Sequence, residues 1–241
     1  MTETIRIAMW SGPRNLSTAM MRSFGTRSDT FCVDEPFYGV YLNETGLKHP
    51  MREEILARHP TSAASIIHDL AYKKFEKPVF YQKHMTHHMI APIPRDWFDR
   101  VRSAFLIRHP ARVLASYAKK AETVSLADIG FVQQAEIFDR VCDQTGKTPV
   151  VIDSDDILRK PKKKLKKLCE ALDIPFTTEM LSWQAGPKPE DGAWAEHWYD
   201  SVNASTGFGD PPGDVPELSG NYHGILAQAL PIYERLSEHK I

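Results

Sequence analysis

Residues 9–21, MWSGPRNLSTAMM, place polar side chains in one turn between a short apolar run and a helix-forming segment. The first backbone N–H groups of a helix have no partner within the helix and carry the positive end of its dipole, so they bind anions such as phosphate. The guanidinium of Arg14 adds a planar set of donors. The turn therefore predicts a phosphate-binding site, whose candidate residues are Pro13, Arg14, Asn15, Leu16, Ser17 and Thr18.

The turn differs from the ATP-binding loop G-x-x-x-x-G-K-[ST]. Ser11 and Leu16 stand at the two Gly positions, and Ser17 stands at the position of the Lys. The pattern is therefore a poor match to an ATP loop. For this segment taken alone, an N-capped helix that binds nothing is the alternative.

A second candidate anion site lies in residues 105–117, FLIRHPARVLASY. An apolar run typical of a buried strand ends at Arg108, and Pro110 suits the first turn of a following helix. Ser116 comes about two turns into that helix. An Arg at the end of a strand beside a helix start is suited to binding an anion, so Arg108 and Ser116 join the candidate site.

Short β-rich runs that alternate with helical patterns must position these residues. The runs typical of buried strands are 5–10, 30–35, 78–84, 102–109 and 148–153. The helical patterns are 17–24, 52–59, 62–75, 110–121 and 126–146. This alternation predicts a three-layer α/β/α fold with a mainly parallel central sheet of about five strands and helices on both faces.

In such sheets ligands bind beyond the carboxyl ends of the strands, which directs attention to residues 11–18, 34–38, 83–88 and 108–116. We expect one domain over 1–241, because its length and 42% hydrophobic content are ordinary for a single globular unit. Residues 38–75 are expected to form a helical insertion that builds much of a substrate pocket. Residues 186–220 are rich in Gly, Pro and polar residues, contain Trp194 and Trp198, and are too long for a plain connector, so they are interpreted as a functional flap.

Composition excludes several classes of partner. The 30 basic and 31 acidic residues nearly balance, so no global charge favours nucleic acid or an acidic membrane surface. The lysines of 159–172 accompany an apolar stripe of Leu165, Leu168 and Leu172 at helical spacing, which indicates a solvated helix face. Three separated cysteines fit neither a disulfide framework nor a metal motif, and no stretch approaches a membrane span. We therefore expect a cytoplasmic protein of undetermined oligomeric state.

The two anion motifs together resemble those of sulfotransferases that use 3′-phosphoadenosine 5′-phosphosulfate (PAPS). Residues 13–18 follow the family loop P-[KR]-S-G-[ST]-[ST], which binds the 5′-phosphosulfate, although Leu16 replaces its Gly. Residues 108–116 match the spacing of the 3′-phosphate motif R-[ND]-P-x-x-x-x-x-S. The segment 150–176 resembles a later strand and helix of the family. Residues 191–202 faintly resemble its G-x-W segment over the cofactor, which assigns Trp194 to the cofactor site.

The resemblance implies a P-loop-type fold and transfer of a sulfuryl group from PAPS to a hydroxyl or amine of a small molecule or carbohydrate. Positioning and charge stabilisation dominate such in-line transfers, and no metal is required because no triphosphate is cleaved. Arg14 is expected to stabilise charge on the departing phosphate in place of a lysine. Residues 187–189, Pro-Lys-Pro, stand where cytosolic members carry an Arg-Lys-Gly clamp.

The acceptor also needs a general base. Glu35, in a Glu-Pro pair, resembles the glutamate base of carbohydrate-type and bacterial members. His84 is the rival, because cytosolic members carry K-x-H at this place, although here His84 follows Lys83 directly. His87 and His88 are further candidates from the same segment. No Cys or carboxylate completes a zinc-like ligand set around these histidines.

Two other functions remain open at this point. A P-loop kinase that uses ATP and Mg²⁺ shares the fold, and the acidic residues of 149–156 could hold the metal, but the loop lysine is missing. A protein that binds the nucleotide without catalysis is the second alternative, since a fold does not determine a function.

Overall fold

A parallel five-stranded sheet forms the centre of the computed structural model, which describes residues 4–119 and 123–241. The strands lie in the order β2-β3-β1-β4-β5. Their bounds are β1 Ile5–Ser11, β2 Thr30–Asp34, β3 Val79–Met85, β4 Arg102–Ile107 and β5 Val150–Asp153. All pairings between neighbouring strands are parallel, so the predicted strands and sheet type are confirmed.

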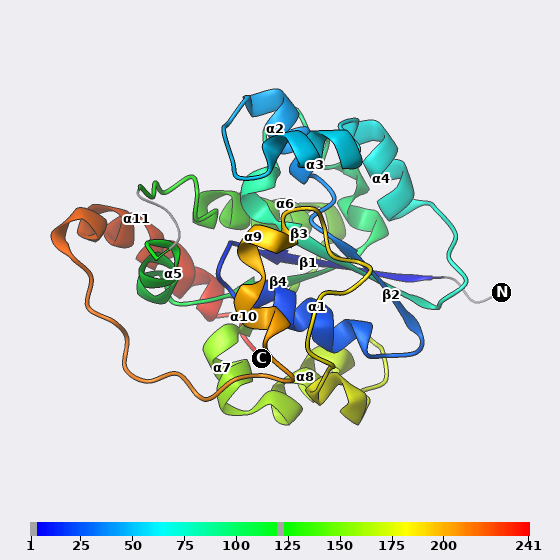
Figure 1. Ribbon diagram of the computed structural model, residues 1–241. Helices are drawn as coiled ribbons and strands as arrows, with labels where there is room; N and C mark the ends of the chain where they lie inside the picture. The colour runs from blue at the N-terminus through cyan, green and yellow to red at the C-terminus, as the bar shows by residue number, and fades with distance from the viewer. Residues whose placement is uncertain (1–3, 120–122) are drawn as a thin grey trace.

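Helices cover both faces of this sheet, as predicted (Figure 1). The α-helices are α1 Ser17–Gly25, α2 Tyr38–Thr45, α3 Arg52–Arg58, α4 Ala63–Ala71, α5 Pro110–Tyr117, α6 Phe131–Thr145, α7 Ser154–Arg159, α8 Pro161–Ala171, α9 Ala195–Trp198, α10 Asp200–Asn203 and α11 Gly220–Ser237. The short 3₁₀ helices are η1 Thr86–His88, η2 Asp96–Arg100 and η3 Thr178–Leu181. Among the described residues, no helix is long and apolar enough to cross a membrane.

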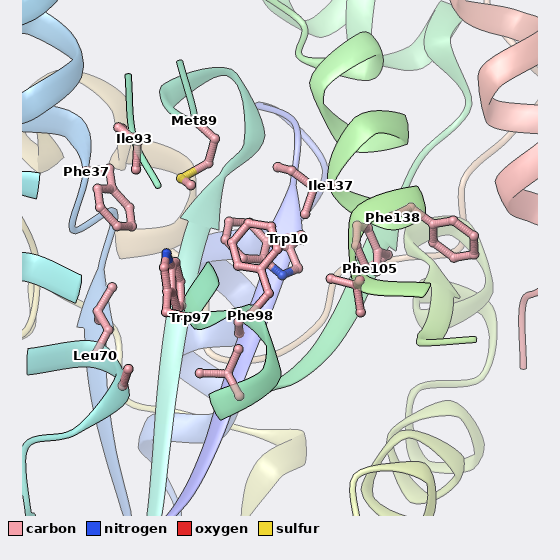
Figure 2. Packing of buried hydrophobic residues seen from close by; sticks show 14 of the residues in the cluster. Trp10, Phe37, Leu70, Met89, Ile93, Trp97, Phe98, Phe105, Ile137 and Phe138 are labelled. Carbon is pink, nitrogen blue, oxygen red and sulfur yellow. The ribbon is translucent and has the colours of Figure 1, made fainter. Parts of the chain in front are cut away.

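Alternation along the strands sorts the core into two layers. On one face Trp10 and Phe105 pack with Trp97 and Phe98 of η2 and with Phe138 of α6 (Figure 2). On the other face, side chains of α1 and α8 pack against strand residues that include Ile7, Met9 and Ile152. Leu165, Leu168 and Leu172 are buried in this second layer, which confirms the apolar stripe predicted beneath the lysines.

Several predicted element ends differ from the structure. The strand predicted to reach 109 ends at Ile107, because the His109 ring accepts a hydrogen bond from the backbone of Ala111 and Pro110 opens α5. The helix predicted over 62–75 ends at Ala71, and the one predicted from 126 begins at Phe131, after Gly130 at φ 69°. The helix predicted over 110–121 ends at Tyr117, and its last two predicted residues lie outside the described residues.

The C-terminal helix α11 continues through a proline. Pro231 lies inside α11, which runs from Gly220 to Ser237. Proline lacks the N–H that a helix interior uses. Packing of this helix against α5 and α6 offsets that loss, since Ala229 and Leu236 are fully buried on either side of the proline.

Candidate functional site

The predicted phosphate-binding turn connects the end of β1 to the start of α1. Arg14 and Leu16 have φ angles of 62° and 72°, in the left-handed region that non-glycine residues seldom adopt. Gly12 leaves no room for a side chain, because a Cβ there would lie 2.5 Å from the carbonyl oxygen of Ile129. The strand and helix therefore meet in a tight loop, with Ser17 at the first position of α1.

Buried polar contacts fix the shape of this loop. The Asn15 side chain is fully buried and donates to the carbonyl of Leu106 at 3.3 Å. The hydroxyl of Ser154 lies 2.6 Å from the carbonyl oxygen of Asn15, and Nη1 of Arg108 donates to the carbonyl of Arg14 at 2.7 Å. Asn15 thus anchors the loop from below, whereas Pro13, Arg14, Leu16, Ser17 and Thr18 line the cavity above it.

The two predicted anion motifs meet in the same place. Nε of Arg14 donates to the hydroxyl of Ser116 at 3.0 Å, and both residues line one cavity together with Arg108. Burial lowers the pKa of both arginines, and Asp155 opposes this effect at Arg108. Nε of Arg108 is buried without a hydrogen-bond partner, and its distance to Asp155 Oδ1 is 3.8 Å. This arrangement leaves guanidinium groups available to an anion in the cavity.

Glu35 lies at the carboxyl end of β2 and also lines the cavity, which has a volume of about 370 Å³. Its Oε1 accepts a hydrogen bond from Nζ of Lys83 at 2.6 Å, and the hydroxyl of Tyr199 lies 3.4 Å from the same oxygen. Burial raises the pKa of Glu35 to about 6, against the opposing effect of the Lys83 ammonium. A carboxyl group with this pKa can accept a proton near neutral pH.

Lys83 is a site residue that sequence reasoning did not select. Burial disfavours its charge, but the carboxylates of Asp34 and Glu35 outweigh burial and raise its pKa. Asp34 is the register partner of Lys83 across the β2–β3 pair, and its Oδ1 lies 2.8 Å from Nζ. The signal available in the sequence was a Lys at the end of one predicted strand and two acidic residues at the end of another.

His84 lies away from the cavity, on the opposite face of the sheet from Lys83. Its ring stacks on Trp10 with a centroid distance of 4.3 Å, and its Nε2 lies 3.1 Å from Oε1 of Gln82. Burial lowers its pKa to about 3. Consecutive side chains of a strand point to opposite faces, so Lys83 and His84 cannot both reach the site. The structure therefore gives His84 a packing position, not the position of a base.

His87 and His88, which follow on η1, do line the cavity. The His88 ring stacks on Tyr38 at a centroid distance of 4.4 Å, and its Nδ1 lies 4.0 Å from Oε2 of Glu35. Burial lowers the pKa of His87 to about 3 and that of His88 well below its ordinary value, so both rings are neutral. His49, from the predicted insertion 38–75, lines the same end of the cavity.

The segment 186–220 also contributes to the cavity, through residues that include Trp198, Tyr199 and Phe208. Trp194 does not line it. Its side chain is 1% exposed, and Nε1 donates to the Tyr199 hydroxyl at 3.1 Å. Trp194 therefore packs in a hydrophobic cluster with side chains of α2 and α3. Trp198 takes the position beside the cavity that was expected of Trp194.

The acidic residues expected of a kinase metal site are engaged in structural contacts. Asp153 is 2% exposed; its Oδ1 accepts from the backbone of Asp155 at 2.8 Å, and its Oδ2 accepts from Tyr233 at 2.7 Å. Asp155 accepts from Arg112 at 2.8 Å. Within the part of the chain that the structure describes, no group of three or more His, Cys, Asp or Glu side chains is arranged to hold a metal ion.

Comparison with known proteins gives consistent results for fold and family. The fold is similar to a sulfotransferase from Alicyclobacillus acidocaldarius, with a TM-score of 0.56, 13% identity, and coverage of 100% of this chain and 98% of that one. It is also similar to the sulfotransferase domain from the curacin biosynthetic pathway, with a TM-score of 0.51, 16% identity, and coverage of 95% and 98%. At these identities the likeness concerns the fold alone.

Two curated relatives from Arabidopsis thaliana are similar in sequence. Branched-chain-amino-acid aminotransferase-like protein 1 is 38% identical over 239 residues, which are 99% of this chain and 43% of the relative. Branched-chain-amino-acid aminotransferase-like protein 2 is 35% identical over 233 residues, which are 97% of this chain and 41% of the relative. The chain thus spans less than half the length of these relatives. A family model described as sulfotransferase domain matches residues 5–239, nearly the whole chain, and the chain therefore belongs to the sulfotransferase domain family.

Proposed function

We propose that this protein transfers a sulfuryl group from PAPS to a hydroxyl group of a small-molecule or carbohydrate acceptor. The observation that carries the proposal is that Arg14, Arg108 and the buried carboxylate of Glu35 line the same cavity. Family membership supports sulfuryl transfer as the reaction, and the donor is inferred from the arginines and the loop.

The residues of the β1–α1 turn and of α5 fit the two phosphate groups of the donor. The donor would supply the sulfuryl group, and the amides of the loop with Arg14 and Ser17 would bind its 5′-phosphosulfate. The guanidinium of Arg108 and the hydroxyl of Ser116, which both line the cavity, suit the 3′-phosphate. Arg14, fixed by its bond to Ser116, would stabilise the negative charge left on the 5′-phosphate.

Glu35 is the proposed base of this reaction. Its Oε1 is engaged by Lys83, so Oε2 is the oxygen that we expect to take the proton from the acceptor hydroxyl. The Lys83 ammonium keeps the buried Glu35 from becoming a permanently protonated acid. Glu35 is also held in an uncommon backbone conformation, with φ at 39°, which is typical of residues that a site constrains.

The acceptor end of the cavity favours an uncharged compound. Tyr38, His49, His88 and Tyr117 line this end, and burial lowers the pKa of both imidazoles. Neutral imidazoles and phenols bind hydroxyl groups through hydrogen bonds but give no ion pair to a charged substrate. Lys83 offsets part of the charge of Glu35. A neutral alcohol or sugar therefore fits this end better than a phosphorylated or ammonium-bearing acceptor.

Calorimetric titration with adenosine 3′,5′-bisphosphate tests the donor site directly. We expect micromolar binding, and Arg108→Ala should weaken it about 10- to 100-fold because a charge-assisted hydrogen bond contributes about 1.5–3 kcal/mol. Arg102→Ala, at the opposite end of β4, is the matched control and should leave binding unchanged. Tighter binding of ATP with Mg²⁺, without preference for the 3′-phosphate, would reject the proposal in favour of a kinase.

A further inference from the structure

Buried charged contacts attach the flap, residues 186–220, to α1 and to the carboxyl end of β2. Arg22 of α1 is 2% exposed and binds both carboxylate oxygens of Asp191, at 2.5 and 2.7 Å. Its Nη2 also donates to Oδ1 of Asn203 at 3.1 Å. The flap is thus held at both its early and its late part by one arginine.

Asp34 forms a second attachment, and this one reaches the proposed base. Its Oδ2 accepts from the Tyr199 hydroxyl at 2.7 Å and lies 3.3 Å from the backbone nitrogen of Gly192, which donates to it. Its Oδ1 accepts from Lys83 at 2.8 Å. The carboxylate therefore contacts the flap with one oxygen and the lysine that binds Glu35 with the other.

The close approach of the flap to Asp34 depends on Gly192. A Cβ at this position would lie 2.2 Å from the ring of Trp194, so only glycine allows the backbone to pass between the ring and the carboxylate. Asp34 is 4% exposed and does not line the cavity, so it has no direct route to a substrate.

We propose that Asp34 is a positioning residue that joins the flap to the base, because it holds Lys83 against Glu35 and anchors Tyr199 and Gly192 on the same carboxylate. This inference rests on the proposed role of Glu35. When the flap is docked, Tyr199 and Lys83 are both fixed beside Oε1 of Glu35. When the flap is displaced, Asp34 loses Tyr199 and Gly192 together, and the geometry around Lys83 loosens.

The charged and titratable groups that face Glu35 come from several elements. Lys83 lies on β3, Asp34 on β2, Tyr199 between α9 and α10, and His88 on η1. Tyr38 on α2 also contacts His88. Burial has the largest effect on the pKa of Glu35 and raises it. The charge of Lys83 lowers this pKa and the charge of Asp34 raises it. The hydrogen bond with Tyr199 lowers it.

These opposite effects allow a test that general structural damage would not imitate. Protein labelled with ¹³C at the glutamate carboxyl carbon is titrated by NMR, with the Glu35 signal assigned from its loss in Glu35→Gln. We expect Asp34→Asn to lower the pKa of Glu35 and Tyr199→Phe to raise it, each by about one pH unit. Hydrogen exchange of residues 188–209 should become faster in both variants, because each loses a flap contact.

Asp29→Asn is the matched control, since Asp29 also pairs with an arginine but lies beyond the opposite end of β2. It should leave the Glu35 pKa and the exchange of the flap unchanged. Shifts of the same sign in Asp34→Asn and Tyr199→Phe, or unchanged flap exchange, would overturn the inference. Binding of adenosine 3′,5′-bisphosphate is measured on the same samples, so that a failure of the proposed function is seen separately from a failure of the role of Asp34.

Discussion

At the scale of single residues, Glu35 and Lys83 form the centre of the proposed catalytic site. A buried carboxylate without a partner would be protonated at neutral pH, and one with a fully matched cation would be a weak base. Lys83 is shared between Asp34 and Glu35, so neither carboxylate is fully neutralised by it. This sharing explains how a buried glutamate has a pKa of about 6.

Glu35→Gln should therefore abolish proton acceptance and leave the donor site intact. We expect sulfuryl transfer to fall by about 100-fold or more, the usual contribution of a general base. In the unmodified protein the rate should fall as pH drops through about 6, because the raised pKa of Glu35 protonates the base there. The measurement is the rate of adenosine 3′,5′-bisphosphate formation against pH with a neutral alcohol acceptor.

Binding of the bisphosphate to Glu35→Gln is the control for folding and should be unchanged. If Glu35→Gln retains nearly full activity and the same fall of the rate at low pH, Glu35 is not the base. His88, at 4.0 Å from its Oε2, would then be the next candidate.

At the scale of elements, the flap depends on one buried ion pair with α1. Asp191→Ala leaves the Arg22 charge buried without a carboxylate, which should lower the free energy of unfolding by about 3–5 kcal/mol. Glu190→Ala removes the neighbouring carboxylate and should cost less than about 1 kcal/mol. Urea unfolding measures both values. Equal losses in the two variants would show that the Arg22–Asp191 pair does not hold the flap.

The sequence predicted the elements well but not which side chain of a strand end faces the site. The two strand-to-helix turns were found because Pro13, Arg14 and Arg108 have clear local signals. Lys83 and His84 could not be distinguished, because β3 is buried on both faces and its pairing with β1 and β2 is a long-range property. The same limit applies to Trp194 and Trp198, whose positions depend on how the flap folds back on Asp34.

At the scale of the whole molecule, the sheet order brings all the site residues to one edge. β1 lies centrally between β3 and β4, so the turn after β1 is flanked by Lys83 on one side and Arg108 on the other. Ligands of open parallel sheets bind at such a place. A chain with nearly balanced charge therefore produces a local group of cations without an overall basic surface.

The buried histidines also connect this architecture to the pH dependence of stability. His84 and His88 are 1% and 2% exposed, and burial holds the pKa of His84 at about 3 and that of His88 well below its ordinary value. Both protonate on unfolding below pH about 6.5, so the unfolded state binds more protons and stability is lost as pH falls toward 3. Glu35 acts in the opposite direction between pH about 6 and 4.5, because its raised pKa makes the folded state bind a proton first.

His84→Gln should reduce the pH dependence of the unfolding free energy by about 1.4 kcal/mol per pH unit between pH 5.5 and 4, the contribution of one proton. Chemical denaturation at several pH values measures this slope. Loss of the stacking on Trp10 lowers stability at every pH but does not alter the slope. His68→Gln, whose side chain is 72% exposed, should leave the slope unchanged. At this position, the folded and unfolded states bind different numbers of protons because the buried imidazole stays neutral. An unchanged slope in His84→Gln would therefore mean that His84 is protonated in the folded protein.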